Sequence, residues 1–141
     1  MKTMKTRSQQ YSQTVYRQIS KLELPEDKTK VYGSLCHNFP LMILRSGLSQ
    51  AVAFVLTKTK LSESEPSKPH IFFLENLAEL TEINLNLQAN EKKVIKFQEK
   101  INTLELNDYM RITRHILAAS IWYKRFAESI LGVKAGDNNA E

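Results

Sequence analysis

The chain has 141 residues and carries 20 lysines and arginines against 15 aspartates and glutamates, a formal net charge of +5. This length suits one domain with one hydrophobic core. Because 42% of the residues are hydrophobic but only four are glycine and four proline, the composition disfavours a sheet protein with its frequent turns and favours an all-α fold. The positive charge makes phosphate-bearing partners plausible.

Membrane and oxidising environments are disfavoured by the sequence. The longest apolar run, Ala51 to Leu56, is far shorter than the ~20 residues that a membrane span needs. The polar N-terminus lacks the apolar region of a signal peptide. Cys36 is the single cysteine, so it has no internal disulfide partner and is interpreted as a small core residue. We therefore expect a cytoplasmic protein without membrane contact.

Apolar residues spaced by three and four predict a first helix from about Thr3 to Leu22. Its packed face would consist of Met4, Ser8, Tyr11, Val15, Ile19 and Leu22. Pro25 ends this helix and, followed by two acidic residues, begins a second one. Since proline is unfavourable in a helix interior, Pro40 predicts a junction at Asn38 or Phe39, followed by a short third helix from Leu41 to Leu44.

The middle of the chain alternates helices with polar connections. Gly47 precedes an apolar helix that begins at Leu48 and ends in a basic segment at Lys60. Residues 61–69 are polar and contain prolines, which predicts a mobile surface loop. Further helices are expected at 71–81 and 94–104, connected by residues 84–90.

The last helix is expected to be the longest, with Asn107 as its N-cap. Beyond Gly132 the sequence has little to bury, which predicts a disordered tail over residues 132–141. Residues 1–131 would then form a single-domain helical bundle of about six helices with a long C-terminal helix.

Two different faces are predicted for the segment from Asn107 to Ile130. One is apolar and is predicted to pack, through Tyr109, Ile112, Ile116, Ile121, Phe126, Ala127 and Ile130. At 100° per residue, Arg114 and Arg125 lie roughly 20° apart and Arg111 lies about 40° from Arg125. The three arginines therefore share a second, cationic face, which is either a solvated surface or a binding surface.

Motifs for catalysis or metal binding are not recognised in the sequence. His37, His70 and His115 fall on three separate predicted elements, and only Cys36 could join them as a metal ligand. Neither a nucleophile motif nor a phosphate-cradling glycine loop is present. We predict no metal, no cofactor and no catalytic residue, and structural roles for the three histidines.

Basic residues recur on several predicted helices, often near tyrosines in sequence. Such residues contact phosphates without reading bases. They are also the ordinary charges that keep a surface in solution, so the pattern leaves both interpretations open.

The order of segments resembles a known family. The segments YGSLCHNFPLMILRSGLSQAVAFV (Tyr32 to Val55) and DYMRITRHILAASIWYKRFAE (Asp108 to Glu128) look like the two hallmark stretches of the small α-helical subunit of the type III-B CRISPR effector, subunit five of the Cmr complex. The opening TRSQQYSQTVYRQI (Thr6 to Ile19) is similar to that family's first helix. Residues 84–104 add nothing to the resemblance.

The resemblance implies a non-catalytic, all-helical subunit. Its copies would stack head to tail beside the backbone subunit and the large subunit, lining the groove in which target RNA pairs with the CRISPR RNA. On this basis the RNA-binding residues are expected to be Arg45, Arg111, Arg114, Lys124 and Arg125, with Lys21, Lys30 and Lys58 as weaker candidates. The alternatives are a helical protein–protein adaptor without RNA contact and a helical metal-dependent nuclease.

Overall fold

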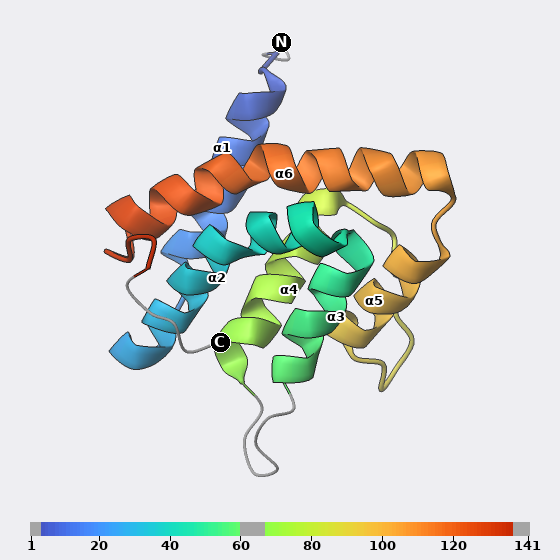
Figure 1. Cartoon of the computed structure of the whole chain (residues 1–141), viewed down its shortest axis with the longest axis horizontal. Helices are drawn as coiled ribbons and strands as arrows, with labels where there is room; N and C mark the ends of the chain where they lie inside the picture. Colours follow the sequence, from blue (N-terminus) through green and yellow to red (C-terminus); the bar gives the residue numbers. More distant parts are fainter. Residues whose placement is uncertain (1–3, 60–66, 137–141) are drawn as a thin grey trace.

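The computed structural model describes residues 4–59 and 67–136, and these residues form six α-helices and no strand. The helices are α1 (Arg7–Ser20), α2 (Glu26–Ser46), α3 (Leu48–Lys58), α4 (Lys68–Thr81), α5 (Lys93–Thr103) and α6 (Leu106–Ser129). In Figure 1, α6 lies across one side of the bundle, α3, α4 and α5 lie beneath it, and α1 crosses it. The predicted all-α bundle with a long C-terminal helix is confirmed.

A capping box begins α1. The Thr6 hydroxyl accepts from the backbone N–H of Gln9 at 3.0 Å, and the Gln9 side chain accepts from the Thr6 N–H at 2.8 Å, which satisfies two of the backbone donors that a helix start leaves free. The helix therefore starts at Arg7 rather than near Thr3. Met4 precedes it and is 94% exposed, so its predicted place on the packed face was wrong.

Pro40 lies inside α2, which runs without interruption from Glu26 to Ser46. The predicted junction at Asn38 or Phe39, with a separate short helix at 41–44, was therefore wrong. An interior proline costs a helix about 3 kcal/mol, but Phe39 and Ile43 on either side are buried in the core, and burying two such side chains returns about 1.5–3 kcal/mol each. The chain actually turns at Gly47, whose φ of 85° favours glycine.

Phe73 on α4 lies at the centre of the core. Its ring contacts three buried rings from two other helices: Tyr32 and Phe39 on α2 at centroid distances of 5.7 and 5.2 Å, and Tyr123 on α6 at 6.0 Å. Aromatic contacts of this kind stabilise beyond their burial alone. Cys36 is buried as predicted.

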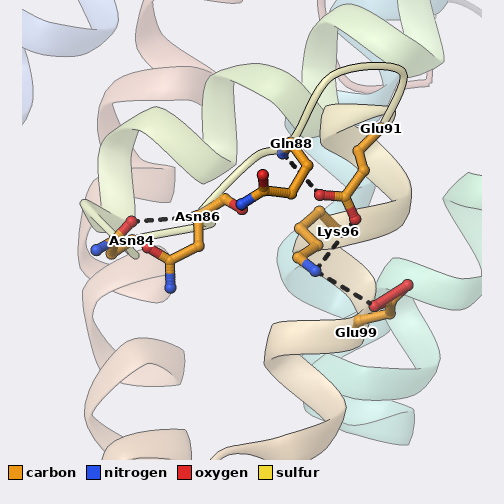
Figure 2. Close-up of polar contacts among 6 residues, drawn as sticks. All are labelled: Asn84, Asn86, Gln88, Glu91, Lys96 and Glu99. Atoms are coloured by element: carbon orange, nitrogen blue, oxygen red, sulfur yellow. Dashed lines mark hydrogen bonds and ion pairs between the residues drawn. The ribbon is translucent and has the colours of Figure 1, made fainter.

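The connection between α4 and α5 is irregular but held by its own polar groups (Figure 2). The Asn84 side chain accepts from the Asn86 N–H at 3.0 Å, and the Glu91 carboxylate accepts from the Gln88 N–H at 2.7 Å. Lys96 on α5 donates to Glu91 at 3.2 Å. These bonds position a connection that the sequence marked only by its lack of periodicity.

The start of α6 and the exposure of two isoleucines in its sequence differ from expectation. Glu105, not Asn107, is the N-cap, and the helix begins at Leu106. Ile121 and Ile130 are 56% and 39% exposed, so their predicted packing was wrong. Ile121 lies roughly 120° around the helix from Tyr109, outside the buried face, which instead includes Ala119 and Tyr123.

Packing continues beyond α6. Val133 is 2% exposed, its N–H donates to the Ala127 carbonyl at 2.9 Å, and its carbonyl lies 2.8 Å from His37 Nε2. The bundle thus extends past the predicted limit at residue 131, and residue 133 of the predicted disordered tail is ordered. Residues 137–141 of that tail and residues 61–66 of the predicted loop lie outside the described residues. Ser67 is the N-cap of α4 and the helix starts at Lys68, so placing Lys68 and Pro69 in the loop was wrong.

Candidate nucleic-acid interface

The outward side of α6 carries the predicted arginine face. Arg111, Arg114 and Arg125 are all exposed, whereas Ile112 and Ile116 on the opposite side of the helix are buried. Arg111 and Arg125 are separated by about 21 Å along the axis at 1.5 Å per residue. The face is therefore an extended cationic strip rather than a point cluster.

Little of this charge is neutralised. Arg111 pairs with Asp108 at 3.4 Å, with both side chains 53% exposed, so the pair is worth at most a fraction of a kcal/mol. Among the ion pairs of residues 4–59 and 67–136, none involves Arg114 or Arg125. The strip keeps most of its positive potential for a partner.

Arg7 from α1 extends the strip. Its guanidinium lies beside the α6 residue His115, with Nη1 3.0 Å from Nδ1 and 3.2 Å from Nε2. Farther along the α1–α6 contact, Trp122 Nε1 donates to the Ser8 hydroxyl at 3.2 Å, and Phe126 packs edge-on against Tyr16 at 5.6 Å. These contacts fix the start of α1 against the arginine-bearing helix.

A pocket of about 560 Å³ opens between α1 and α6. Arg7, Arg111, Arg114 and His115 give it a basic rim, and Ser8, Tyr11, Ala118 and Ile121 complete its lining. Its volume falls within the range of small-ligand sites.

His115 is held neutral in this pocket. Partial burial, together with the positive charges of Arg7, Arg111 and Arg114, lowers the pKa of His115, while the carboxylate of Glu82 opposes the shift. The Tyr11 hydroxyl also hydrogen-bonds to Nδ1. Because guanidinium N–H groups only donate, the ring must offer Arg7 an acceptor nitrogen, which a neutral imidazole has and a charged one lacks.

Arg45 on α2 and Lys58 on α3 lie at a second place, where Phe54 is the residue they share. Arg45 lines a groove of about 400 Å³ together with Leu41, Met42 and Phe54, and the Lys58 ammonium lies 5.3 Å from the centre of the Phe54 ring. The exposed Leu44 belongs to the same last turns of α2. This surface is as much apolar as basic.

The remaining candidates lie apart from the strip. Lys124 is exposed, but as the neighbour of Arg125 it projects about 100° away around α6. Lys21, at the end of α1, lines a separate pocket that also contains Glu23 and Glu75. Lys30 is exposed near the start of α2. The structure thus does not gather the eight predicted residues into one patch.

Arg7, Tyr11 and His115 line the α1–α6 pocket but are not among the eight site residues that the sequence predicted. Arg7 and His115 are separated by 108 positions, and a local pattern cannot connect residues so distant. Only the crossing of α1 over α6 brings them together (Figure 1).

The described part of the chain assembles neither a metal site nor a reactive thiol. Over residues 4–59 and 67–136 there is no group of three His, Cys, Asp or Glu side chains that could hold a metal ion. Burial raises the pKa of the Cys36 thiol, so that thiol stays protonated and unreactive. In the same residues, no helix is both long and apolar enough to cross a membrane.

Comparison with known proteins gives concordant matches. The family model of a CRISPR-associated protein (Cas_Cmr5) matches residues 7–130. The CRISPR system Cmr subunit Cmr5 of Thermus thermophilus is 29% identical over 128 residues, covering 91% of this chain and 98% of that protein. The crystal structure of a Cmr5 family protein from the same organism matches with a TM-score of 0.62 and 28% identity, covering 90% of this chain and 98% of that one.

Proposed function

Since the chain belongs to the Cmr5 family of CRISPR-associated proteins, we propose that it is the small, non-catalytic subunit of a cytoplasmic type III-B CRISPR effector (Cmr) complex in antiviral defence. In this role it assembles with the backbone and large subunits and with further copies of itself. Its basic surface lines the groove where target RNA pairs with the CRISPR RNA.

The arginine strip on α6 carries the RNA part of this proposal. A subunit that serves many guide sequences must bind the RNA backbone without reading bases, and spread guanidinium groups do this. The strip is long, exposed and only weakly paired within the described residues. Arg7 adds a cation from a second helix. Arg45, Lys58, Lys124, Lys21 and Lys30 remain proposed contacts of lower weight, because they lie apart from the strip.

The α2–α3 surface supports the assembly part of the proposal. Leu44 is 70% exposed, and Leu41 and Phe54 are each 45% exposed, which is unusual for three large apolar side chains gathered on two adjacent helices. A head-to-tail stack needs two different complementary faces on each copy. We assign this apolar surface to a contact with another protein subunit. An adaptor that binds proteins but no RNA would need such a surface too.

Reversal of two charges on the strip tests the RNA role. In the assembled complex, Arg114→Glu with Arg125→Glu should weaken binding of all target sequences and reduce the salt dependence of affinity by about one unit of slope per lost phosphate contact. Both side chains are exposed, so the stability should change by only about 0.5 kcal/mol.

The matched control is Lys92→Glu with Lys68→Glu, which reverses two exposed charges away from the strip. If the strip variant assembles normally and binds RNA with unchanged affinity and salt slope, the strip is a solvated surface. The adaptor function would then be the better account.

A further inference from the structure

Three guanidinium groups and a neutral imidazole surround the α1–α6 pocket. Arg7 approaches it from α1, Arg111 and Arg114 from α6, and His115 lies between them. Opposing charge comes from Asp108, which pairs with Arg111, and from Glu82 at the C-terminal end of α4, which acts on His115. Two carboxylates therefore face three arginines, and the pocket keeps an excess of positive charge.

Arg7 has an unusual partner for an arginine. A guanidinium normally binds a carboxylate or phosphate, with which it forms strong charge-assisted hydrogen bonds. Here Arg7 donates to the His115 ring, a neutral acceptor, and the ion pairs of the described residues do not include Arg7. The Arg7 guanidinium is thus held in place at the edge of the pocket of about 560 Å³.

We propose that the α1–α6 pocket binds one phosphate group, held by Arg7, Arg111 and Arg114, and that His115 takes up a proton when the phosphate enters. This deepens the proposed function, on which it rests for the identity of the ligand as a phosphate of the RNA backbone. The volume also admits the sugar attached to that phosphate, with Ala118 and Ile121 as the apolar part of the lining.

The proton uptake follows from the hydrogen bonds. A phosphate oxygen is a better acceptor for Arg7 than the imidazole, so binding releases the acceptor nitrogen of His115. The anion also offsets the guanidinium charges that lower the pKa of His115. The ring can then bind a proton from solvent and donate it in a hydrogen bond to the phosphate. Because the bound state holds more protons, phosphate affinity rises as pH falls.

Nuclear magnetic resonance of the free protein can follow this directly, because the chain has only three histidines. With inorganic phosphate, compared with sodium chloride of equal ionic strength, the pKa of His115 should rise while the resonances of the buried His37 and His70 stay in place. His115→Gln assigns the signal and should remove the pH dependence of binding that exceeds the titration of phosphate itself. An unchanged pKa of His115, or equal shifts of all three histidines, would overturn the proposal.

Charge variants separate the pocket from general electrostatics. Arg7→Gln should weaken the phosphate response of His115 about tenfold, since it removes a charge-assisted hydrogen bond. Lys92→Gln, the matched loss of one exposed charge away from the pocket, should leave the response intact. Equal responses of the two variants would contradict a built site.

The same resonance experiment is repeated with a short single-stranded RNA in place of inorganic phosphate. A rise in the pKa of His115 with both ligands supports a backbone phosphate as the natural occupant. A rise with inorganic phosphate alone overturns the RNA assignment and leaves a free-phosphate site. Arg114 belongs to both the pocket and the strip, whereas Arg125 does not line the pocket. Arg125→Glu alone in the assembled complex therefore tests the strip with the pocket intact, so failure of the pocket and failure of the RNA-binding role remain distinguishable.

Discussion

Gly33 on α2 and Val133 beyond the end of α6 are in direct contact, and the valine occupies the space that a side chain at residue 33 would fill. A Cβ on residue 33 would lie 2.5 Å from Val133 Cβ and 2.7 Å from each of its two Cγ atoms. Glycine in a helix interior costs about 1 kcal/mol relative to alanine. Here it allows the segment after α6 to dock against α2.

Gly33→Ala should therefore destabilise the protein by about 1–3 kcal/mol, despite the better helix propensity of alanine, because Val133 must be displaced. Urea unfolding measures the change, and faster amide exchange of residues 131–134 would locate it. Val133→Gly is the matched control: Gly33→Ala added to it should be neutral or stabilising. A stabilised Gly33→Ala single variant would contradict the contact.

The imidazole of His70 predicts a pH dependence of stability. His70 is 4% exposed, its Nδ1 bonds to the Ser67 hydroxyl at 2.6 Å, and its Nε2 finds no partner among the described residues. Burial, assisted by the charges of Lys58 and Lys28, lowers the pKa of His70 to about 4. The unfolded chain, with a pKa near 6.5, therefore takes up the proton first as pH falls.

The free energy of unfolding should thus decrease by about 2–3 kcal/mol on account of His70 as the pH falls from near 6.5 to near 4. Above pH 6.5 the contribution of His70 should not change with pH. His70→Gln should show a correspondingly shallower pH dependence in urea unfolding. Parallel pH profiles for the variant and the parent protein would count against a buried neutral His70.

Leu44 tests the assignment of the α2–α3 surface to a protein contact. Because its side chain is 70% exposed, Leu44→Asp should leave the unfolding free energy within about 0.5 kcal/mol while reducing incorporation into the Cmr complex severalfold in a pull-down. Leu87→Asp, at a 44% exposed leucine in the α4–α5 connection, is the control. Equal incorporation of both variants would remove the assignment.

The free protein should be largely monomeric at micromolar concentration, because heterologous stacking contacts act in a row beside other subunits. Sedimentation velocity over a dilution series checks this. A tight two-fold dimer that persists on dilution would argue against the stacking model.

Isolated protein should not cleave RNA or DNA. The described residues contain no metal-ligating cluster, and the three arginines of the strip cannot act as general bases at neutral pH. Incubation of single-stranded RNA and DNA with the protein and Mg²⁺ or Mn²⁺ tests this. Cleavage that a point substitution in this chain abolishes would establish the nuclease alternative.

The sequence by itself determined the helical class, most helix positions and the arginine strip, because all three follow from spacing within one segment. A 3.6-residue period places Arg114 and Arg125 on one face whatever the helix packs against. The same local rule misplaced Ile121, since an apolar residue outside the stripe was counted as part of it.

Only the tertiary structure decided the features that depend on contacts between distant segments. Burial of Phe39 and Ile43 carries α2 through Pro40 against its local preference, and the space at Gly33 orders Val133. The crossing of α1 over α6 brings Arg7 to His115 across 108 positions. Energies of packing and of charges at close range outweigh local propensity at these places, and no pattern along the chain encodes which distant residues meet.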